Sequence, residues 1–257
     1  MKQVSASVIS NLELTPGYHL IHVDAPDIAA TSQPGQFVTV RCGEELTLRR
    51  PLSIHQLTDS KNLYLLFKIA GKGTLWLSQR KERERLDLIG PLGKGFSIEP
   101  TSRKLLLVAG GIGIAPLVFL AKKALREKRS VKLLLGARTK DELYPQKFLP
   151  NGIEAIITTE DGSEGEKGKI TDVLSRYVDW TDQIYACGPL DMYRTIAHQR
   201  QSWSVKKPIQ VSLEVRMGCG IGACFSCSIK TKNGMKQVCH NGPVFNLDEV
   251  ILEEMKI

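Results

Sequence analysis

The sequence predicts a multi-domain β plus α/β protein, and three changes of pattern along its 257 residues support this prediction. Residues 1–98 carry short apolar runs separated by turn signals, which is typical of an antiparallel β-barrel. In residues 99–208, apolar runs alternate with helical patterns, which favours a parallel α/β sheet. Residues 209–257 hold four of the six cysteines, and we expect them to form a third, small domain.

The composition is that of an ordinary globular protein, with 42% hydrophobic and 24% charged residues. No apolar run reaches the roughly 18 residues that a membrane-spanning helix needs. The first residues lack the basic and then apolar order of a signal peptide. We therefore expect a cytoplasmic protein whose thiols stay reduced.

The net charge of +8, from 35 basic and 27 acidic residues, raises the question of a nucleic-acid partner. The densest charged run, residues 80–85, alternates in sign, so a solvated surface is the favoured interpretation. Aromatic residues make up 6% of the chain and do not interleave with a basic stripe, as base stacking requires. We expect no nucleic-acid binding.

In the first region, apolar runs predict strands, and Pro34-Gly35 and Gly90-Pro91 predict turns. The expected strands cover residues 5–14, 18–26, 35–42, 51–57 and 62–71.

In the second region, the apolar pattern changes to one of alternating strands and helices. The expected strands cover residues 104–109, 130–137, 153–159 and 182–188, and the expected helices cover residues 116–128, 141–148, 171–177 and 189–201.

The run from Gly111 to Pro116, GIGIAP, lies where the first strand of this region gives way to a helix. Small residues there allow a pyrophosphate to approach the backbone, and the helix N-terminus offers unpaired amides. Proline replaces the third glycine of the usual dinucleotide fingerprint but suits a first helical turn. A purely structural turn is the alternative.

Cys187-Gly188-Pro189 follows the last strand of the region and again begins a helix. Ligands of open α/β sheets bind at the carboxyl ends of the strands. Cys187 is therefore a candidate for contact with a nicotinamide ring, and a small buried side chain is the alternative.

Two motifs in the first region combine positive charge, hydroxyl groups and small residues. Arg49-Arg50-Pro51-Leu52-Ser53 offers a guanidinium, which binds a diphosphate bidentately. Lys68-Ile69-Ala70-Gly71-Lys72-Gly73-Thr74 offers an ammonium, two glycines that allow close approach, and a hydroxyl. Each motif is common on protein surfaces, so their order along the chain carries the argument.

The cysteines follow the spacing Cys219-x4-Cys224-x2-Cys227-x11-Cys239. Plant-type ferredoxins ligate a [2Fe–2S] cluster through a C-x4-C-x2-C run and a later cysteine. Glycines between the first two cysteines allow the sharp loop that three thiolates on one cluster require. The alternatives are a structural zinc site, which usually pairs two C-x2-C units, and simple buried thiols.

The order R-x-x-S, G-x-G-T, GPLGxGF, GGIGIAP and CGP resembles that of the ferredoxin–NADP reductase superfamily over nearly the whole chain. The tail SLEVRMGCGIGACFSCSIKT with VCHNGPVF is similar to that of the electron-transfer subunits of type B dihydroorotate dehydrogenases. The resemblance implies an FAD-binding barrel in residues 1–98, an NAD-binding domain in residues 99–208 and a [2Fe–2S] domain in residues 209–257.

The resemblance also implies site residues. FAD contacts are expected at Arg50, Pro51, Leu52, Ser53, Phe67, Lys68, Ile69, Gly73 and Thr74. NAD(H) contacts are expected at Gly111, Gly113, Pro116, Cys187, Gly188 and Pro189, and cluster ligands at Cys219, Cys224, Cys227 and Cys239. No acid–base catalytic residue is expected, because the cofactors carry the redox chemistry.

By the same resemblance, the partner is an FMN-containing dihydroorotate dehydrogenase catalytic subunit, in a heterotetramer of two copies each. Electrons would pass from dihydroorotate through that FMN, the cluster and FAD to NAD+, in UMP biosynthesis. The alternatives are a reductase subunit of a hydrogenase, a sulfide-linked reductase or an oxygenase, and, in another class, a zinc-stabilised binding module. No clear basic pair follows the second α/β strand beyond Arg138, so NADH is favoured over NADPH.

Overall fold

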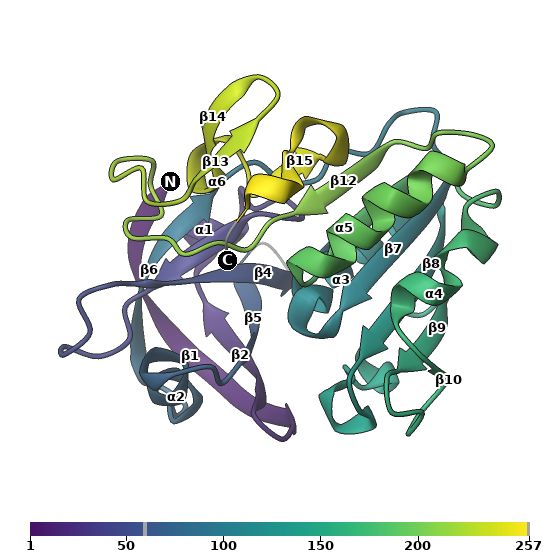
Figure 1. Ribbon diagram of the computed structural model, residues 1–257. Coiled ribbons are helices and arrows are strands. Elements are labelled where there is room, and N and C mark those ends of the chain that lie inside the picture. Colours follow the sequence, from purple (N-terminus) through teal and green to yellow (C-terminus); the bar gives the residue numbers. More distant parts are fainter. Residues whose placement is uncertain (59–60, 256–257) are drawn as a thin grey trace.

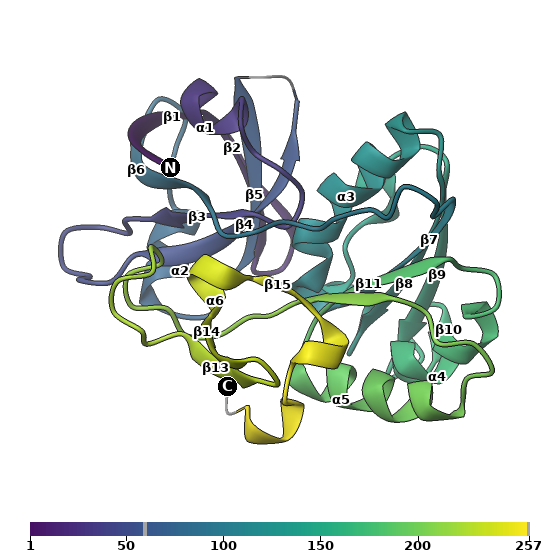
Figure 2. The same ribbon diagram turned by 90° about the horizontal axis from the view of Figure 1, so that it is seen from above.

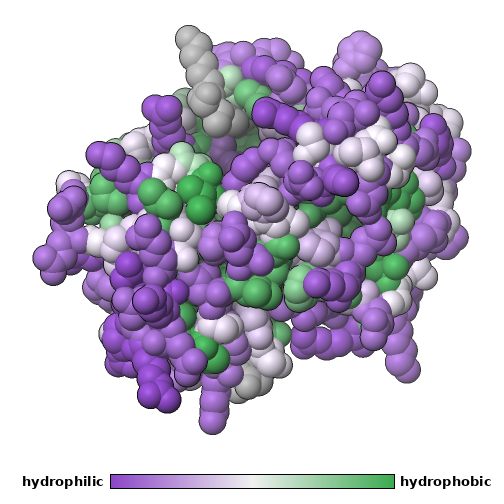
Figure 3. Space-filling view, turned by 90° about the horizontal axis from the view of Figure 1, so that it is seen from below, coloured by the Kyte–Doolittle hydropathy of each residue, from purple (hydrophilic) through white to green (hydrophobic). Residues whose placement is uncertain are grey.

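The computed structural model describes residues 1–58 and 61–255, in which a β-barrel and an α/β sheet lie side by side (Figure 1). The cysteine-rich C-terminal segment lies against both (Figures 1 and 2). Within the described residues, no helix is long and apolar enough to cross a membrane. On the face shown in Figure 3, hydrophobic side chains form separate patches within a mostly hydrophilic surface.

The barrel is closed by six antiparallel strands in the order β1-β2-β5-β4-β3-β6, which confirms the predicted architecture. The strands are β1 (Lys2–Thr15), β2 (Tyr18–Asp24), β3 (Phe37–Val40), β4 (Arg50–Leu57), β5 (Asn62–Lys68) and β6 (Arg85–Leu92), with the short helices α1 (Pro26–Ala29) and α2 (Lys72–Ser78). Strand β6 was not predicted, and the expected turn at Gly90-Pro91 is wrong. This dipeptide lies within β6, where Gly90 packs against Val38 and leaves no room for a side chain.

The second sheet has seven strands in the order β10-β9-β8-β7-β11-β12-β15, of which all but β15 are parallel. The strands are β7 (Lys104–Gly110), β8 (Ser130–Ala137), β9 (Ile153–Thr159), β10 (Glu166–Lys167), β11 (Gln183–Cys187), β12 (Ile209–Ser212) and β15 (Val244–Asn246). Helix α3 (Ile114–Arg126) covers the face towards the barrel, and α4 (Ile170–Leu174) and α5 (Leu190–Gln199) cover the other. Alternate residues of β7 enter the two cores, as expected of a strand buried on both faces.

The predicted helix at residues 141–148 is wrong. Two short 3-10 turns, η2 (Lys140–Glu142) and η3 (Gln146–Phe148), take its place. Pro145 separates them because proline has no amide hydrogen to donate and disfavours a helical conformation at Tyr144 before it. The other 3-10 turns are η1 (Gly111–Gly113), η4 (Ser175–Tyr177), η5 (Arg200–Ser202), η6 (Leu247–Glu249) and η7 (Leu252–Glu254).

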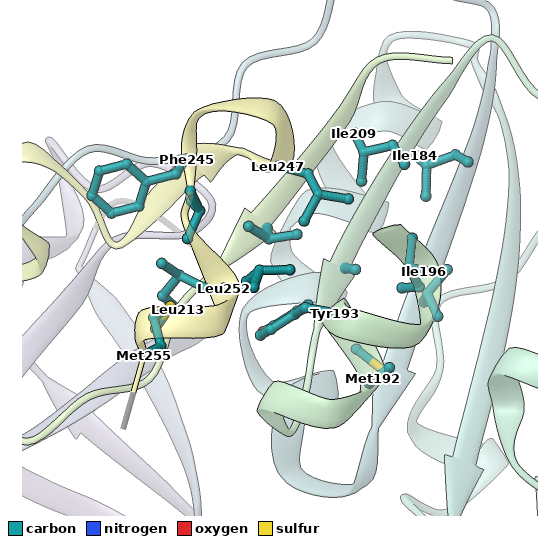
Figure 4. Packing of buried hydrophobic residues seen from close by; sticks show 14 of the residues in the cluster. Ile184, Met192, Tyr193, Ile196, Ile209, Leu213, Phe245, Leu247, Leu252 and Met255 are labelled. Atoms are coloured by element: carbon teal, nitrogen blue, oxygen red, sulfur yellow. The ribbon is translucent and has the colours of Figure 1, made fainter. Parts of the chain in front are cut away.

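The C-terminal segment contributes two strands to the α/β sheet. Strand β12 pairs with β11, and β15 returns antiparallel to β12. Between them lie the cysteine loop, the hairpin β13 (Ser228–Thr231) and β14 (Gly234–Gln237), and α6 (Val238–Asn241). Side chains of α5, β11, β12 and residues 245–255 point into one apolar core (Figure 4). The three domain boundaries stay a prediction, since these strands join the second and third regions.

A buried histidine joins the barrel to the α/β half. His55 of β4 is fully buried, with Nδ1 2.9 Å from the Ala115 carbonyl oxygen and Nε2 3.0 Å from the Tyr144 hydroxyl. Its Nδ1 donates to the carbonyl, so a neutral ring accepts from Tyr144 through Nε2. Burial lowers the pKa of His55 to about 4.

We expect acid to destabilise the fold through His55. Because its folded pKa lies below the usual 6.5, the stabilisation is complete above pH 6.5 and is lost as the pH falls towards 4. Between pH 7 and pH 5 the free energy of unfolding should fall by about 2 kcal/mol from this group. Thermal unfolding of wild type and His55→Leu across this range is the measurement. The variant should be less stable at pH 7 but have a flatter pH dependence, and equal slopes would contradict the assignment.

Candidate functional site

A cavity of about 420 Å³ opens between the barrel and the α/β half. Six of the nine predicted FAD residues line it, namely Pro51, Leu52, Ser53, Phe67, Lys68 and Thr74. Strands β4 and β5 pair with each other, which brings the two motifs together although they are apart in the sequence. The site contacts themselves stay a prediction.

Arg50 and Gly73 lie beside this cavity and against each other. A Cβ on Gly73 would lie 2.6 Å from Arg50 Nε, so the absence of a side chain there makes room for the guanidinium. Arg50 Nη1 also donates to the Leu48 carbonyl oxygen at 2.7 Å. Thr74 Oγ1 accepts from the Ala70 amide at 2.8 Å and shapes the turn into α2. Ile69 follows β5 and is not part of the cavity wall.

Lys68 has a partner that the sequence did not indicate. Its Nζ donates to Glu142 Oε1 at 2.7 Å, across the boundary between the barrel and the α/β half. The hydrogen bond that Lys68 donates to Glu142 raises the pKa of Lys68, while partial burial opposes that shift. The ammonium therefore stays charged at neutral pH at the edge of the cavity.

Another wall of the cavity is formed by residues 212–217, from the end of β12 towards the cysteines, and the sequence did not indicate this role for them. Glu214 is open to the cavity, yet the surrounding protein desolvates its carboxyl and raises its pKa. Met217, in the same wall, precedes Cys219 by two residues. The cavity is thus continuous with the cysteine loop along the backbone.

A second cavity, of about 350 Å³, lies at the carboxyl ends of β7, β8 and β9. Of the predicted NAD residues, Gly111 and Pro189 line it, whereas Gly113, Pro116, Cys187 and Gly188 do not. Its charged wall consists of residues outside those motifs. These are Arg138, Glu142, Glu160, Lys169 and Asp191.

Gly113 and Cys187 are packed backbone to backbone. A Cβ on Gly113 would lie far closer to the Cys187 carbonyl oxygen than van der Waals contact allows, so only glycine lets η1 and the end of β11 meet. The Cys187 thiol is 1% exposed, and burial raises its pKa well above the usual value. It is a neutral thiol beside Tyr193 and Ser212.

The four predicted ligands form two pairs of neighbouring thiols, Cys219 with Cys224 and Cys227 with Cys239. The first pair is the more accessible, and the second is buried. In residues 1–58 and 61–255, no three His, Cys, Asp or Glu side chains surround a common point suited to one metal ion. Two pairs suit a [2Fe–2S] cluster, in which each iron takes two thiolates.

Backbone amides stabilise charge on these sulfurs. Cys219 Sγ accepts hydrogen bonds from the amides of Ile221, Ala223 and Cys224 at 3.3–3.4 Å. Cys227 Sγ accepts one from the Cys239 amide at 3.4 Å. Such bonds favour thiolates and tune a cluster's potential.

The two thiol pairs also differ in acidity. Hydrogen bonding to Ser226 lowers the pKa of Cys224 to about 6, whereas burial raises that of Cys239 to about 12.

The cysteine loop rests on the barrel. Gly220 and Gly222 have φ of +74° and +88°, which glycine adopts without strain. A Cβ on Gly220 would lie 2.5 Å from Thr39 Cγ2, so the loop touches β3 at this point. Gln237 Nε2 donates to the Gly222 carbonyl oxygen at 2.9 Å and links the loop to β14.

A six-stranded barrel, a cavity at the carboxyl ends of parallel strands and a loop of paired cysteines define an iron–sulfur electron-transfer oxidoreductase of the ferredoxin reductase type. The oxidoreductase NAD-binding domain matches residues 107–198, and the iron-sulfur cluster binding domain of dihydroorotate dehydrogenase B matches residues 214–251. The chain belongs to the family of dihydroorotate dehydrogenase B (NAD(+)) electron transfer subunits and serves as such a subunit in pyrimidine biosynthesis.

Relatives in that family match end to end. The subunit from Desulforamulus reducens is 43% identical over 262 residues, which cover 98% of this chain and 99% of that protein. The subunit from Bacillus cereus is 37% identical, with 98% and 100% covered. These matches confirm the resemblance predicted from the motifs, and the iron–sulfur interpretation of the cysteines over the zinc one.

Solved structures show the same fold. A chain of the NADH-dependent reduced ferredoxin-NADP oxidoreductase is 30% identical, with a TM-score of 0.88 over 98% of this chain and 91% of that one. The ferredoxin reductase in carbazole 1,9a-dioxygenase is 24% identical, with a TM-score of 0.70 over 79% and 66%.

Proposed function

We propose that the chain carries FAD in the larger cavity, NAD(H) in the smaller one and a [2Fe–2S] cluster on Cys219, Cys224, Cys227 and Cys239. Electrons from dihydroorotate would enter through the cluster and leave as NADH. The observation that carries this proposal is the single stretch of chain, residues 212–219, that walls the larger cavity and then supplies the first thiolate.

The need for both groups follows from electron counting. A bound flavin exchanges electrons singly or in pairs, whereas an iron–sulfur cluster passes one at a time and NAD+ accepts a hydride. The protein's own residues bind and orient these groups and exclude water between them. The barrel supplies Arg50, Ser53 and Thr74 for the polar parts of FAD, and Leu52 and Phe67 for its apolar face.

The charges around the smaller cavity favour NADH over NADPH. Glu160 and Asp191 contribute two carboxylates against two cations from Arg138 and Lys169, while Lys68 neutralises Glu142. A 2′-phosphate would meet no excess of positive charge there, while the carboxylates of Glu160 and Asp191 can accept hydrogen bonds from ribose hydroxyls.

Removing the Arg50 guanidinium tests the FAD site. We expect Arg50→Ala to weaken FAD binding about tenfold to a hundredfold, because a charge-assisted hydrogen bond is worth roughly 1.5–3 kcal/mol. Flavin content after gel filtration and titration of the apoprotein with FAD measure this. Arg49→Ala is the matched control, since Arg49 pairs with Asp87 at 2.5 Å instead. Equal flavin retention in the two variants would contradict the assignment.

The partner we propose is an FMN-containing dihydroorotate dehydrogenase catalytic subunit, in a heterotetramer of two copies each. Cys224 is the most accessible of the four thiols. Its neighbour Phe225 is 67% exposed, and Ile221 on the same loop is 43% exposed. A neighbouring subunit that covered these apolar side chains would approach the cluster closely.

Reconstitution tests the proposal. The reaction is dihydroorotate + NAD+ → orotate + NADH + H+, and we expect it only when the anaerobically purified chain is mixed with the catalytic subunit. The reaction should be at least about tenfold slower with NADP+. Its 2′-phosphate replaces a ribose hydroxyl that can donate to a carboxylate, and one lost polar contact costs about 1.4 kcal/mol or more. Absence of NADH formation in the mixture would contradict the proposal.

A further inference from the structure

The segment between β8 and β9, residues 138–149, is fastened to the barrel at two points. Glu142 pairs with Lys68 of β5 at 2.7 Å, and Tyr144 shares a 3.0 Å hydrogen bond with His55 of β4. The two barrel strands are neighbours in the sheet, so both attachments fall on one side of the barrel. This is the segment where the expected helix is absent. Two short 3-10 turns separated by Pro145 take its place, and the segment contacts the barrel.

The first attachment stands between the two cavities. Lys68 lines the larger cavity and Glu142 lines the smaller one. Their side chains are 40% and 28% exposed, and an ion pair so accessible to water contributes about 0–1 kcal/mol to stability. The pair therefore contributes little to the stability of the fold. Its position between the two cavities indicates that it fixes one cavity relative to the other.

The second attachment is buried and fully satisfied. Both nitrogens of His55 are used, one by Tyr144 and the other by the carbonyl of Ala115, which itself lines the larger cavity. A satisfied buried polar network favours one arrangement of the groups it joins over others of similar packing. Here it joins a barrel strand, the first turn of α3 and the segment 138–149.

We propose that Glu142 and Tyr144 are positioning residues, which tie the nucleotide cavity to the barrel and so set the distance over which hydride is transferred. The inference rests on the proposed function, since it needs a nicotinamide in one cavity and a flavin in the other. The step is NADH + FAD + H+ → NAD+ + FADH2 or its reverse, and neither residue gives or takes a proton or electron in it. Displacing reacting atoms by about 1 Å can slow such a step about a hundredfold.

The test uses the purified complex of both subunits under anaerobic conditions. Stopped-flow absorbance gives the rate of flavin reduction by NADH at saturation and, from its concentration dependence, the Kd for NADH. We expect Glu142→Gln and Tyr144→Phe each to lower the saturated rate about tenfold, with the Kd changed less than about twofold. Hydrogen–deuterium exchange over residues 138–149 should rise in both variants.

Glu154→Gln is the matched control, because it breaks another lysine–glutamate pair, Lys132–Glu154 at 2.5 Å, that lies within the nucleotide domain alone. It should leave the rate, the Kd and the exchange at wild-type values. A Kd for NADH that rises in step with the loss of rate in Glu142→Gln would show that Glu142 binds the nucleotide directly, and would overturn the proposal.

An unchanged saturated rate in Glu142→Gln would overturn it too, and this partly exposed position keeps the test informative if Tyr144→Phe does not fold. If NADH fails to reduce the flavin of the wild-type complex, the proposed function fails before any variant is compared.

Discussion

We expect Cys224→Ser to abolish electron transfer from dihydroorotate to NAD+ while leaving the flavin in place. Cys224 is one of the paired thiols, and hydrogen bonding holds its pKa at about 6, which favours the thiolate that binds iron. Loss of this ligand should remove the cluster and slow NAD+ reduction in the complex by about a hundredfold or more. Iron content, visible absorbance and the rate with both subunits measure the effect.

Cys224 is not among the residues that line the larger cavity, so FAD content and NADH–dye reductase activity should remain near wild type. Cys42→Ser is the control, because Cys42 lies in the barrel core and belongs to neither thiol pair. Loss of FAD together with the cluster in Cys224→Ser would contradict separate sites for the two cofactors.

Gly113→Ala should damage both the nucleotide domain and NADH binding. The added methyl group would overlap the Cys187 carbonyl, which belongs to the backbone of β11 and cannot rotate away as a side chain could. Overpacking of this kind costs about 1–3 kcal/mol or more, which corresponds to a fall in Tm of about 5 °C or more. Affinity for NADH should fall about tenfold, because η1 includes Gly111, which lines the cavity.

Gly71→Ala provides the comparison for this variant. Gly71 has φ of 171°, extended backbone that any residue adopts, and a Cβ there meets nothing within 4 Å. Gly71→Ala should lower the free energy of unfolding by at most about 1 kcal/mol, because alanine is a poorer N-cap for α2, and the affinity for NADH should be unchanged. If Gly113→Ala were no more harmful than Gly71→Ala, close packing of η1 on β11 would not be a requirement of the fold.

The parts of the site that could be predicted from sequence are those made by residues close together in the chain. Cys219, Cys224 and Cys227 predict a cluster because three potential ligands lie on one loop. The run from Gly111 to Pro116 likewise combines strand end, turn and helix start. In both cases local geometry alone restricts the chemistry.

The parts that could not be predicted depend on packing between distant segments. Glu142 lies opposite Lys68 because Pro145 prevents a helix and lets the segment cross to the barrel. Glu214 reaches the larger cavity because β12 pairs with β11 and directs the following chain back to the barrel. Strand β6 has buried Leu86, Leu88 and Leu92 in alternation, and the turn signal within it concealed this pattern.

The content of iron and acid-labile sulfide in the anaerobically purified chain tests the central claim most directly. Four thiolates in two pairs predict about two irons and two sulfides for each FAD. Protein that folds and binds FAD but contains neither iron nor sulfide would contradict the claim, and with it the route from a one-electron donor to NAD+.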